Sequence, residues 1–132
     1  MLEMDKGYIN DMVTHALEED PNECCGILAG PQSKVVKLYR ITNTEHSPYR
    51  YNMDPRELFL AYRDIENNGW ELLAIYHSHT HSPAYPSATD VRLASWADAL
   101  YILVSLIDHE NPVVRAFQIA DGTRAEQELL II

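Results

Sequence analysis

Apolar residues recur along the chain with two spacings, which divide it into predicted helices and strands. Lys6–Glu19 carries apolar residues three or four positions apart, which predicts an amphipathic helix. Asp20–Asn22 ends this helix, because the proline inside it cannot continue the hydrogen-bond ladder. A second helix is predicted to begin after Asp54, where an acidic N-cap precedes Pro55 in the first turn, and to end at Asn67–Gly69.

Shorter apolar or alternating runs predict strands. They cover residues 23–30, 33–41, 70–79, 100–107 and 113–119, and a hairpin turn at Asp121-Gly122 leads into a final strand of about seven residues. Residues 43–51 predict a loop or an edge strand, and residues 87–97 predict a third helix. Helices and strands alternate early and strands gather late, so we expect an α/β fold, a mixed sheet flanked by helices, in one domain spanning residues 1–132.

Charge and composition exclude several classes of protein. The net charge of −10 would repel a phosphate backbone, so a nucleic-acid partner is not expected. No apolar run reaches the roughly 20 residues that a membrane span needs. The N-terminal residues lack the pattern of a secretory signal, so we expect a cytoplasmic protein. Cys24 and Cys25 are adjacent and would face opposite ways on a strand, which predicts buried free thiols in a reducing compartment.

The end of the strand predicted over 70–79 carries the chemistry of the chain. Residues two apart on a strand share a face, so His77 and His79 present their rings on one side. Zinc in a hydrolytic site takes three N or O ligands and leaves a fourth position for water, and Asp90 can complete the set. Ser-x-x-Asp before a helix is also typical of a capping box, so Ser87 and Asp90 can have that structural role alone, or both roles together.

His-x-His, seven residues and Ser-x-x-Asp together resemble the signature of the JAMM (MPN+) metallopeptidases. Glu23, which precedes a run of small residues, matches the upstream glutamate of that family. The resemblance covers nearly the whole chain and is closest to the small bacterial members that act on ubiquitin-like sulfur-carrier proteins. Thr80 stands where many family members have proline, a departure shared with that subgroup. The narrower match rests on residues 76–80, 84–87, 89–91 and 101–105.

The resemblance implies an MPN/JAB fold, a curved mixed sheet with helices on both sides, similar to that of cytidine deaminases. It implies a zinc ion held by His77, His79 and Asp90. Glu23 would take a proton from water and pass it to the leaving amine, and Ser87 would donate to the developing oxyanion. The implied substrate is a β-grasp sulfur carrier that ends in Gly-Gly, from which the enzyme would release cysteine as a step in cysteine biosynthesis.

Two alternatives stay open from the sequence. The enzyme could instead remove a ubiquitin-like carrier from a lysine side chain. A non-catalytic MPN interaction module is the other alternative, although such modules typically lose ligands and every expected position is filled here. His81 is expected to face solvent or to lie near the substrate, and the sequence assigns no role to the other histidines, which are His15, His46 and His109.

Overall fold

The computed structural model describes residues 1–132 and is built around a six-stranded sheet of order β3-β2-β4-β5-β6-β7. The strands are β2 Cys25–Gly30, β3 Lys37–Ile41, β4 Glu71–His79, β5 Leu100–Ser105, β6 Val113–Ala120 and β7 Thr123–Gln127. β4 and β5 are parallel and all other neighbours are antiparallel, so the predicted mixed sheet is confirmed.

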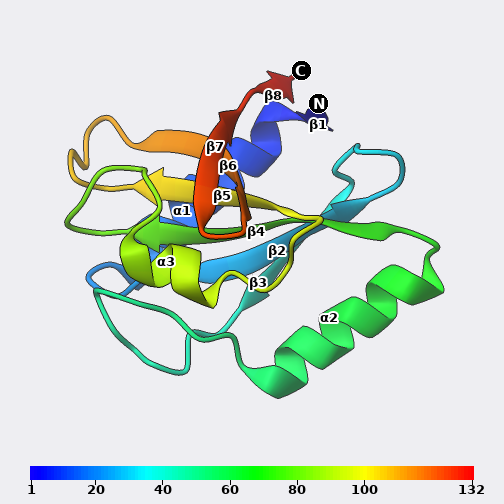
Figure 1. Ribbon diagram of the computed structural model, residues 1–132, viewed down its shortest axis with the longest axis horizontal. Coiled ribbons are helices and arrows are strands. Elements are labelled where there is room, and N and C mark those ends of the chain that lie inside the picture. Colours follow the sequence, from blue (N-terminus) through cyan, green and yellow to red (C-terminus); the bar gives the residue numbers. More distant parts are fainter.

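Three helices and a small second sheet complete the fold. The helices are α1 Lys6–Glu19, α2 Pro55–Asn67 and α3 Ala88–Leu93. The second sheet pairs β1 Leu2–Met4 in parallel with β8 Leu129–Ile131, which brings the two termini together (Figure 1). None of the three helices is both long and apolar enough to cross a membrane.

An apolar cluster covers each face of the large sheet. Met12 and Ala16 of α1 pack with Leu28 on one face, and Ile65 of α2 packs with Ile27 on the other. Ile27 and Leu28 are neighbours on β2, and alternation along the strand sends them to opposite sides. The prediction of helices on both faces of the sheet is therefore confirmed. In Figure 1, α1 is partly hidden behind the strands and α2 lies apart from it at the lower right.

The adjacent cysteines follow the same alternation. Cys24 belongs to the cluster under α1 and Cys25 to the cluster under α2, and both are buried and free. Burial raises the pKa of the Cys24 thiol to about 12 and raises that of Cys25 further. The prediction of buried, free thiols is confirmed.

The predicted helix over 87–97 is wrong beyond Leu93. The backbone becomes extended at Ala94, and the N–H groups of Ser95 and Trp96 each donate to the hydroxyl of Tyr101 at 3.0 Å. These two hydrogen bonds to a side chain of β5 use backbone N–H groups that would otherwise bond within a longer helix.

Two predicted strands differ most from the structure, while the other strands begin or end within two residues of the prediction. The strand predicted over 33–41 begins only at Lys37, because Gln32 and Ser33 have positive φ and the Val35 N–H donates to the Glu3 carbonyl in β1. The single final strand is wrong as well. The chain divides at Glu128 into β7, which stays in the large sheet, and β8, which leaves it for β1. The sequence did not predict β1, since three residues are too few to show a period.

Residues 43–53 form a loop whose two ends pair with each other. Of the two predictions for this segment, the loop is therefore confirmed and the edge strand is wrong. An isolated antiparallel bridge joins Asn43 to Met53, and the Thr44 N–H donates to the Asn52 carbonyl at 2.9 Å. This segment, the 43–53 loop, lies between β3 and α2 in the chain.

His15 is a buried titratable group on the face of the sheet that α1 covers. Its side chain on α1 is 4% exposed, and its Nδ1 lies 2.7 Å from the Tyr76 hydroxyl. Burial lowers the pKa of this imidazole from 6.5 to about 4, with Arg40 adding to the effect and Glu18 opposing it.

We predict that His15→Gln flattens the loss of stability in acid. Between pH 6.5 and about 4 the unfolded chain binds a proton at His15 that the folded chain does not. The stabilisation that comes from keeping His15 neutral is therefore complete above pH 6.5. It is lost as the pH falls to about 4, which lowers the free energy of unfolding by on the order of 3 kcal/mol. Glutamine stays neutral and can still bond Tyr76. Urea unfolding across this pH range checks the prediction, and equal pH dependence in parent and variant would contradict it.

Candidate metal centre

The last residues of β4 alternate between the two faces of the sheet, as predicted. His77 and Ser78 are fully buried and His79 is 4% exposed. The Ser78 hydroxyl accepts the Cys24 N–H at 2.8 Å on the face opposite the histidines. Both imidazoles are therefore left on the face that α2 and α3 cover.

Asp90 reaches the two histidines from the first turn of α3. The Ser87 hydroxyl accepts the Asp90 N–H at 3.0 Å, and Asp90 Oδ2 accepts the Ser87 N–H at 2.9 Å, which is a capping box. The same Oδ2 lies 2.9 Å from His79 Nε2 and 3.2 Å from His77 Nε2. The capping role and the proximity to the histidines hold together, because the cap turns the Asp90 carboxylate back toward the strand end.

The three side chains form a compact donor group. One ligand atom each from His77, His79 and Asp90 lies within 4.8 Å of the other two. Neither ring nitrogen of His77 makes a hydrogen bond, although the residue is fully buried. A buried polar group without a partner is costly, and a metal ion bound at Nε2, the nitrogen that faces Asp90, would satisfy one of the two nitrogens. The donor group therefore fits a metal such as zinc, which takes two imidazoles and a carboxylate.

The tautomer of His79 suits this role. Its Nδ1 lies 2.8 Å from the Pro83 carbonyl, which can only accept, so Nδ1 carries the proton. With a metal ion in place of the proton between His79 and Asp90, the lone pair of Nε2 would be directed to that ion. A second hydrogen bond that orients a ligating imidazole is typical of metal sites.

The charges of the donor group also favour metal binding. Burial lowers the pKa of His77, and Asp90 opposes this shift. Burial opposes ionisation of Asp90, but the rings of His77 and His79 outweigh it and hold the Asp90 pKa well below its ordinary value. Burial also works against protonation of His79, yet Asp90 and the Pro83 carbonyl outweigh it and raise the His79 pKa. A metal ion would replace the proton that His79 shares with Asp90.

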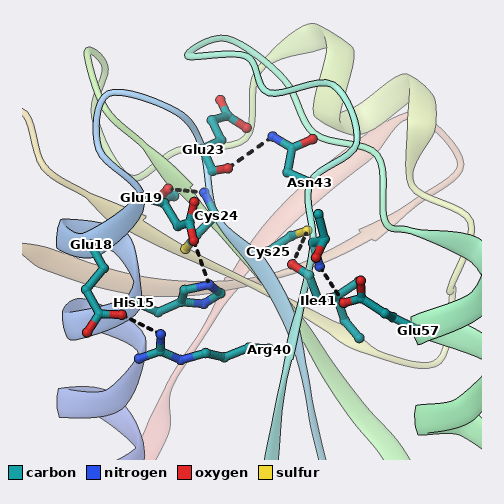
Figure 2. Close-up of polar contacts among 12 residues, drawn as sticks. His15, Glu18, Glu19, Glu23, Cys24, Cys25, Arg40, Ile41, Asn43 and Glu57 are labelled. Carbon is teal, nitrogen blue, oxygen red and sulfur yellow. Dashed lines mark hydrogen bonds and ion pairs between the residues drawn. The ribbon is translucent and has the colours of Figure 1, made fainter.

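Glu23 lies beside the donor group without joining it. It precedes β2, is 3% exposed, and its Oε1 has no hydrogen-bond partner. Burial raises the pKa of its carboxyl to about 8, with His79 opposing and Asp90 reinforcing the shift. Figure 2 shows its backbone carbonyl bonded to Asn43 while the carboxylate projects away. A carboxyl group with a pKa near neutrality can carry a proton to and from water.

Tyr51 completes the immediate surroundings of His77. The two rings stack with centroids 4.5 Å apart and planes at 27°. In the sequence Tyr51 belongs to an aromatic run, Tyr49-Arg50-Tyr51. That run could line a groove or form a half-buried edge strand, and the sequence does not favour the groove. No local signal identifies Tyr51 or Pro83 as part of the site. Tyr51 contacts His77, which is far away in the chain, and Pro83 reaches His79 around a turn.

His81 and His109 lie outside the donor group. His81 is exposed, with its Nδ1 2.8 Å from the Thr80 hydroxyl and its ring beside Tyr49. His109 pairs with Asp20 at 3.0 Å on the surface.

A cavity of about 240 Å³ opens beside Asp90. Its wall is largely aromatic and aliphatic, with polar groups at several points, and is formed by Arg50, Tyr51, Asn52, Met53, Leu58, Ile75, Thr89, Asp90, Leu93, Ser95, Trp96 and Tyr101. Such a cavity next to a metal centre can hold an apolar side chain of a bound molecule.

Comparison with known proteins gives consistent results. Residues 5–120 match the family described as prokaryotic homologs of the JAB domain. The CysO-cysteine peptidase of Mycobacterium tuberculosis is 40% identical over 126 residues, which are 94% of this chain and 86% of that protein. A probable TtuB-protein conjugate cleaving protease of Thermus thermophilus is 34% identical over 92% of this chain and 78% of its own. The solution structure of a Desulfitobacterium hafniense protein superimposes with a TM-score of 0.90 at 36% identity, covering 100% of this chain and 93% of that one.

We predict that a divalent metal stabilises the fold through the donor group. A chelator should lower the Tm and added zinc should restore it, since a ligand at 100 times its Kd stabilises the folded state by about 2.7 kcal/mol. His77→Ala and Asp90→Ala should lose both this response and the metal, measured by thermal unfolding and elemental analysis. His109→Ala, which removes a surface histidine, should keep both. Full metal occupancy in the first two variants would rule out this donor group.

Proposed function

The chain belongs to the prokaryotic JAB family and is a peptidase of that family, and from this premise we propose that it uses zinc to hydrolyse an amide bond at the C-terminus of a ubiquitin-like sulfur-carrier protein. The observation that carries the proposal is the buried donor group of His77, His79 and Asp90 with Glu23 beside it. A carrier-cysteine adduct is the favoured substrate, because a relative that is 40% identical over 94% of the chain is named a CysO-cysteine peptidase.

Each residue of the site has a distinct role in this reaction. His77, His79 and Asp90 would hold the zinc, which supplies a Lewis acid that polarises the scissile carbonyl and acidifies water. Glu23 takes the proton from the attacking water, holds it on its carboxylate and delivers it to the leaving amine. The Ser87 oxygen already accepts a backbone N–H at 3.0 Å, so its own proton remains free to donate to the developing oxyanion.

The 43–53 loop supports an extended binding mode for the tail of the carrier. The N–H and C=O groups of Tyr51 make no hydrogen bond within the chain. An extended tail could pair with them, which is the usual main-chain mode of peptide capture. Tyr51 also stacks on His77, so a tail paired there would pass the metal centre. Two terminal glycines would allow the backbone to approach closely, because glycine has no Cβ.

Removal of a carrier from a lysine side chain is the second candidate. It is favoured by the relative named a TtuB-protein conjugate cleaving protease, which is 34% identical over 92% of this chain. The two reactions share the acyl side of the bond and differ in the leaving amine, so rates on both substrates will separate them. The non-catalytic interpretation is wrong, because relatives over nearly the whole chain are named peptidases and the donor group is complete.

We predict that Glu23→Gln keeps zinc and loses nearly all turnover. The amide preserves the size of the side chain and removes the base, and general acid–base catalysis is typically worth about 10²–10⁴-fold. Single-turnover rates on the cysteine adduct, at equal zinc content by elemental analysis, provide the measurement. Activity within a few-fold of the parent would show that Glu23 does not carry the proton.

We also predict that the enzyme is selective for the terminal glycines of the carrier. Carrier-cysteine adducts with valine at either glycine should release cysteine far more slowly, since a branched side chain would block close approach of the tail backbone. A substitution on the globular body of the carrier, away from the tail, serves as the control and should change the rate little. Equal rates for the parent adduct and both valine adducts would contradict the extended binding mode.

A further inference from the structure

The peptide group between Glu23 and Cys24 is held from both sides by buried side chains. Asn43 Nδ2 donates to the Glu23 carbonyl at 3.0 Å, which Figure 2 shows, and the Cys24 N–H donates to the Ser78 hydroxyl at 2.8 Å. The Glu23 N–H donates in turn to the Ser47 carbonyl at 2.9 Å. The backbone of Glu23 is therefore bonded on both sides of its Cα.

Asn43 uses its whole side-chain amide in this arrangement. It is 8% exposed, and its Oδ1 accepts the N–H groups of Glu45 and Asn52, both at 3.0 Å. Its Nδ2 donates to the Arg50 carbonyl at 3.1 Å as well as to Glu23. One side chain thus joins the backbone of Glu23 to the loop whose Tyr51 stacks on His77.

Ser78 makes the second connection from the strand of the histidines. It is fully buried between His77 and His79 in the chain, and its N–H donates to the Cys24 carbonyl at 3.1 Å. Its hydroxyl accepts the Cys24 N–H. A shift of Glu23 away from the donor group would therefore break bonds to the same segment of β4 that carries the donors.

The Glu23 carboxyl itself has little to hold it. Its Oε1 makes no hydrogen bond, so the position of the side chain depends on the backbone from which it projects. We propose that Asn43 and Ser78 are positioning residues, which clamp the Glu23–Cys24 peptide group and so set the distance between the Glu23 carboxylate and the metal. This inference rests on the proposed function, in which Glu23 carries the proton.

The test compares Asn43→Asp and Ser78→Ala with the parent. Asn43→Asp keeps an oxygen for Glu45 and Asn52 but removes the donor to the Glu23 carbonyl. Each variant should lower kcat on the cysteine adduct by about 10- to 100-fold, the order expected when a catalytic group is displaced by about 1 Å. KM and zinc affinity should stay within a few-fold of the parent. The double variant should lose less than the product of the two losses, because both side chains hold one peptide group.

Asn68→Asp is the matched control. It removes the same kind of donor, since Asn68 Nδ2 donates to the Asp64 carbonyl at 2.8 Å at the end of α2. It should keep the kcat of the parent. The proposal would be overturned if both zinc-loaded test variants kept the kcat of the parent and lost only thermal stability. It would also be overturned if the loss of kcat in the double variant equalled the product of the two single losses.

Amide hydrogen exchange provides a readout that does not depend on activity. The Cys24 amide should exchange faster in both variants than in the parent, because the clamp protects it. Should the parent not cleave the adduct at all, the proposed function fails while exchange still decides whether the clamp exists. Unchanged Cys24 exchange in both variants would overturn the clamp.

Discussion

Four consecutive side chains with polar groups are buried at the end of β4, and the rest of the site follows from their need for partners. The Tyr76 hydroxyl bonds a histidine of α1, the Ser78 hydroxyl accepts a backbone N–H that precedes β2, and the His79 ring bonds a carbonyl of the next loop. His77 alone makes no hydrogen bond; its Nε2 lies 3.2 Å from Asp90 Oδ2, and an aromatic ring covers it. That unsatisfied imidazole is the strongest structural reason to place a metal ion there.

The pleat of β4 separates structural from chemical roles. Tyr76 and Ser78 point to the α1 side, where Tyr76 packs so closely on Gly26 that a Cβ there would lie 2.3 Å from the tyrosine ring. His77 and His79 point to the α3 side and meet Asp90. One strand therefore secures its own position with one set of residues and presents donors with the other.

Glu23 reaches the site through sheet pairing. β2 runs antiparallel to β4 with Cys25 opposite His77, so the residue two before Cys25 lies at the same end of the sheet as the donor group. The pairing sets the position of the backbone, and the loop that follows β3 covers it from the other side. Burial then raises the pKa of the Glu23 carboxyl to about 8, near the range in which a group can both accept and release a proton.

The sequence by itself determined the features that depend on neighbours in the chain. Alternation placed His77 and His79 on one face, the capping pattern turned Asp90 toward them, the spacing of apolar residues located α1, and an acidic N-cap before a proline located α2. The tertiary structure alone decided the features that depend on distant contacts. The hydroxyl of Tyr101 ends α3 early, β8 leaves the large sheet for β1, and Tyr51 covers His77. Such contacts join residues far apart in sequence, so no period or spacing along the chain can indicate them.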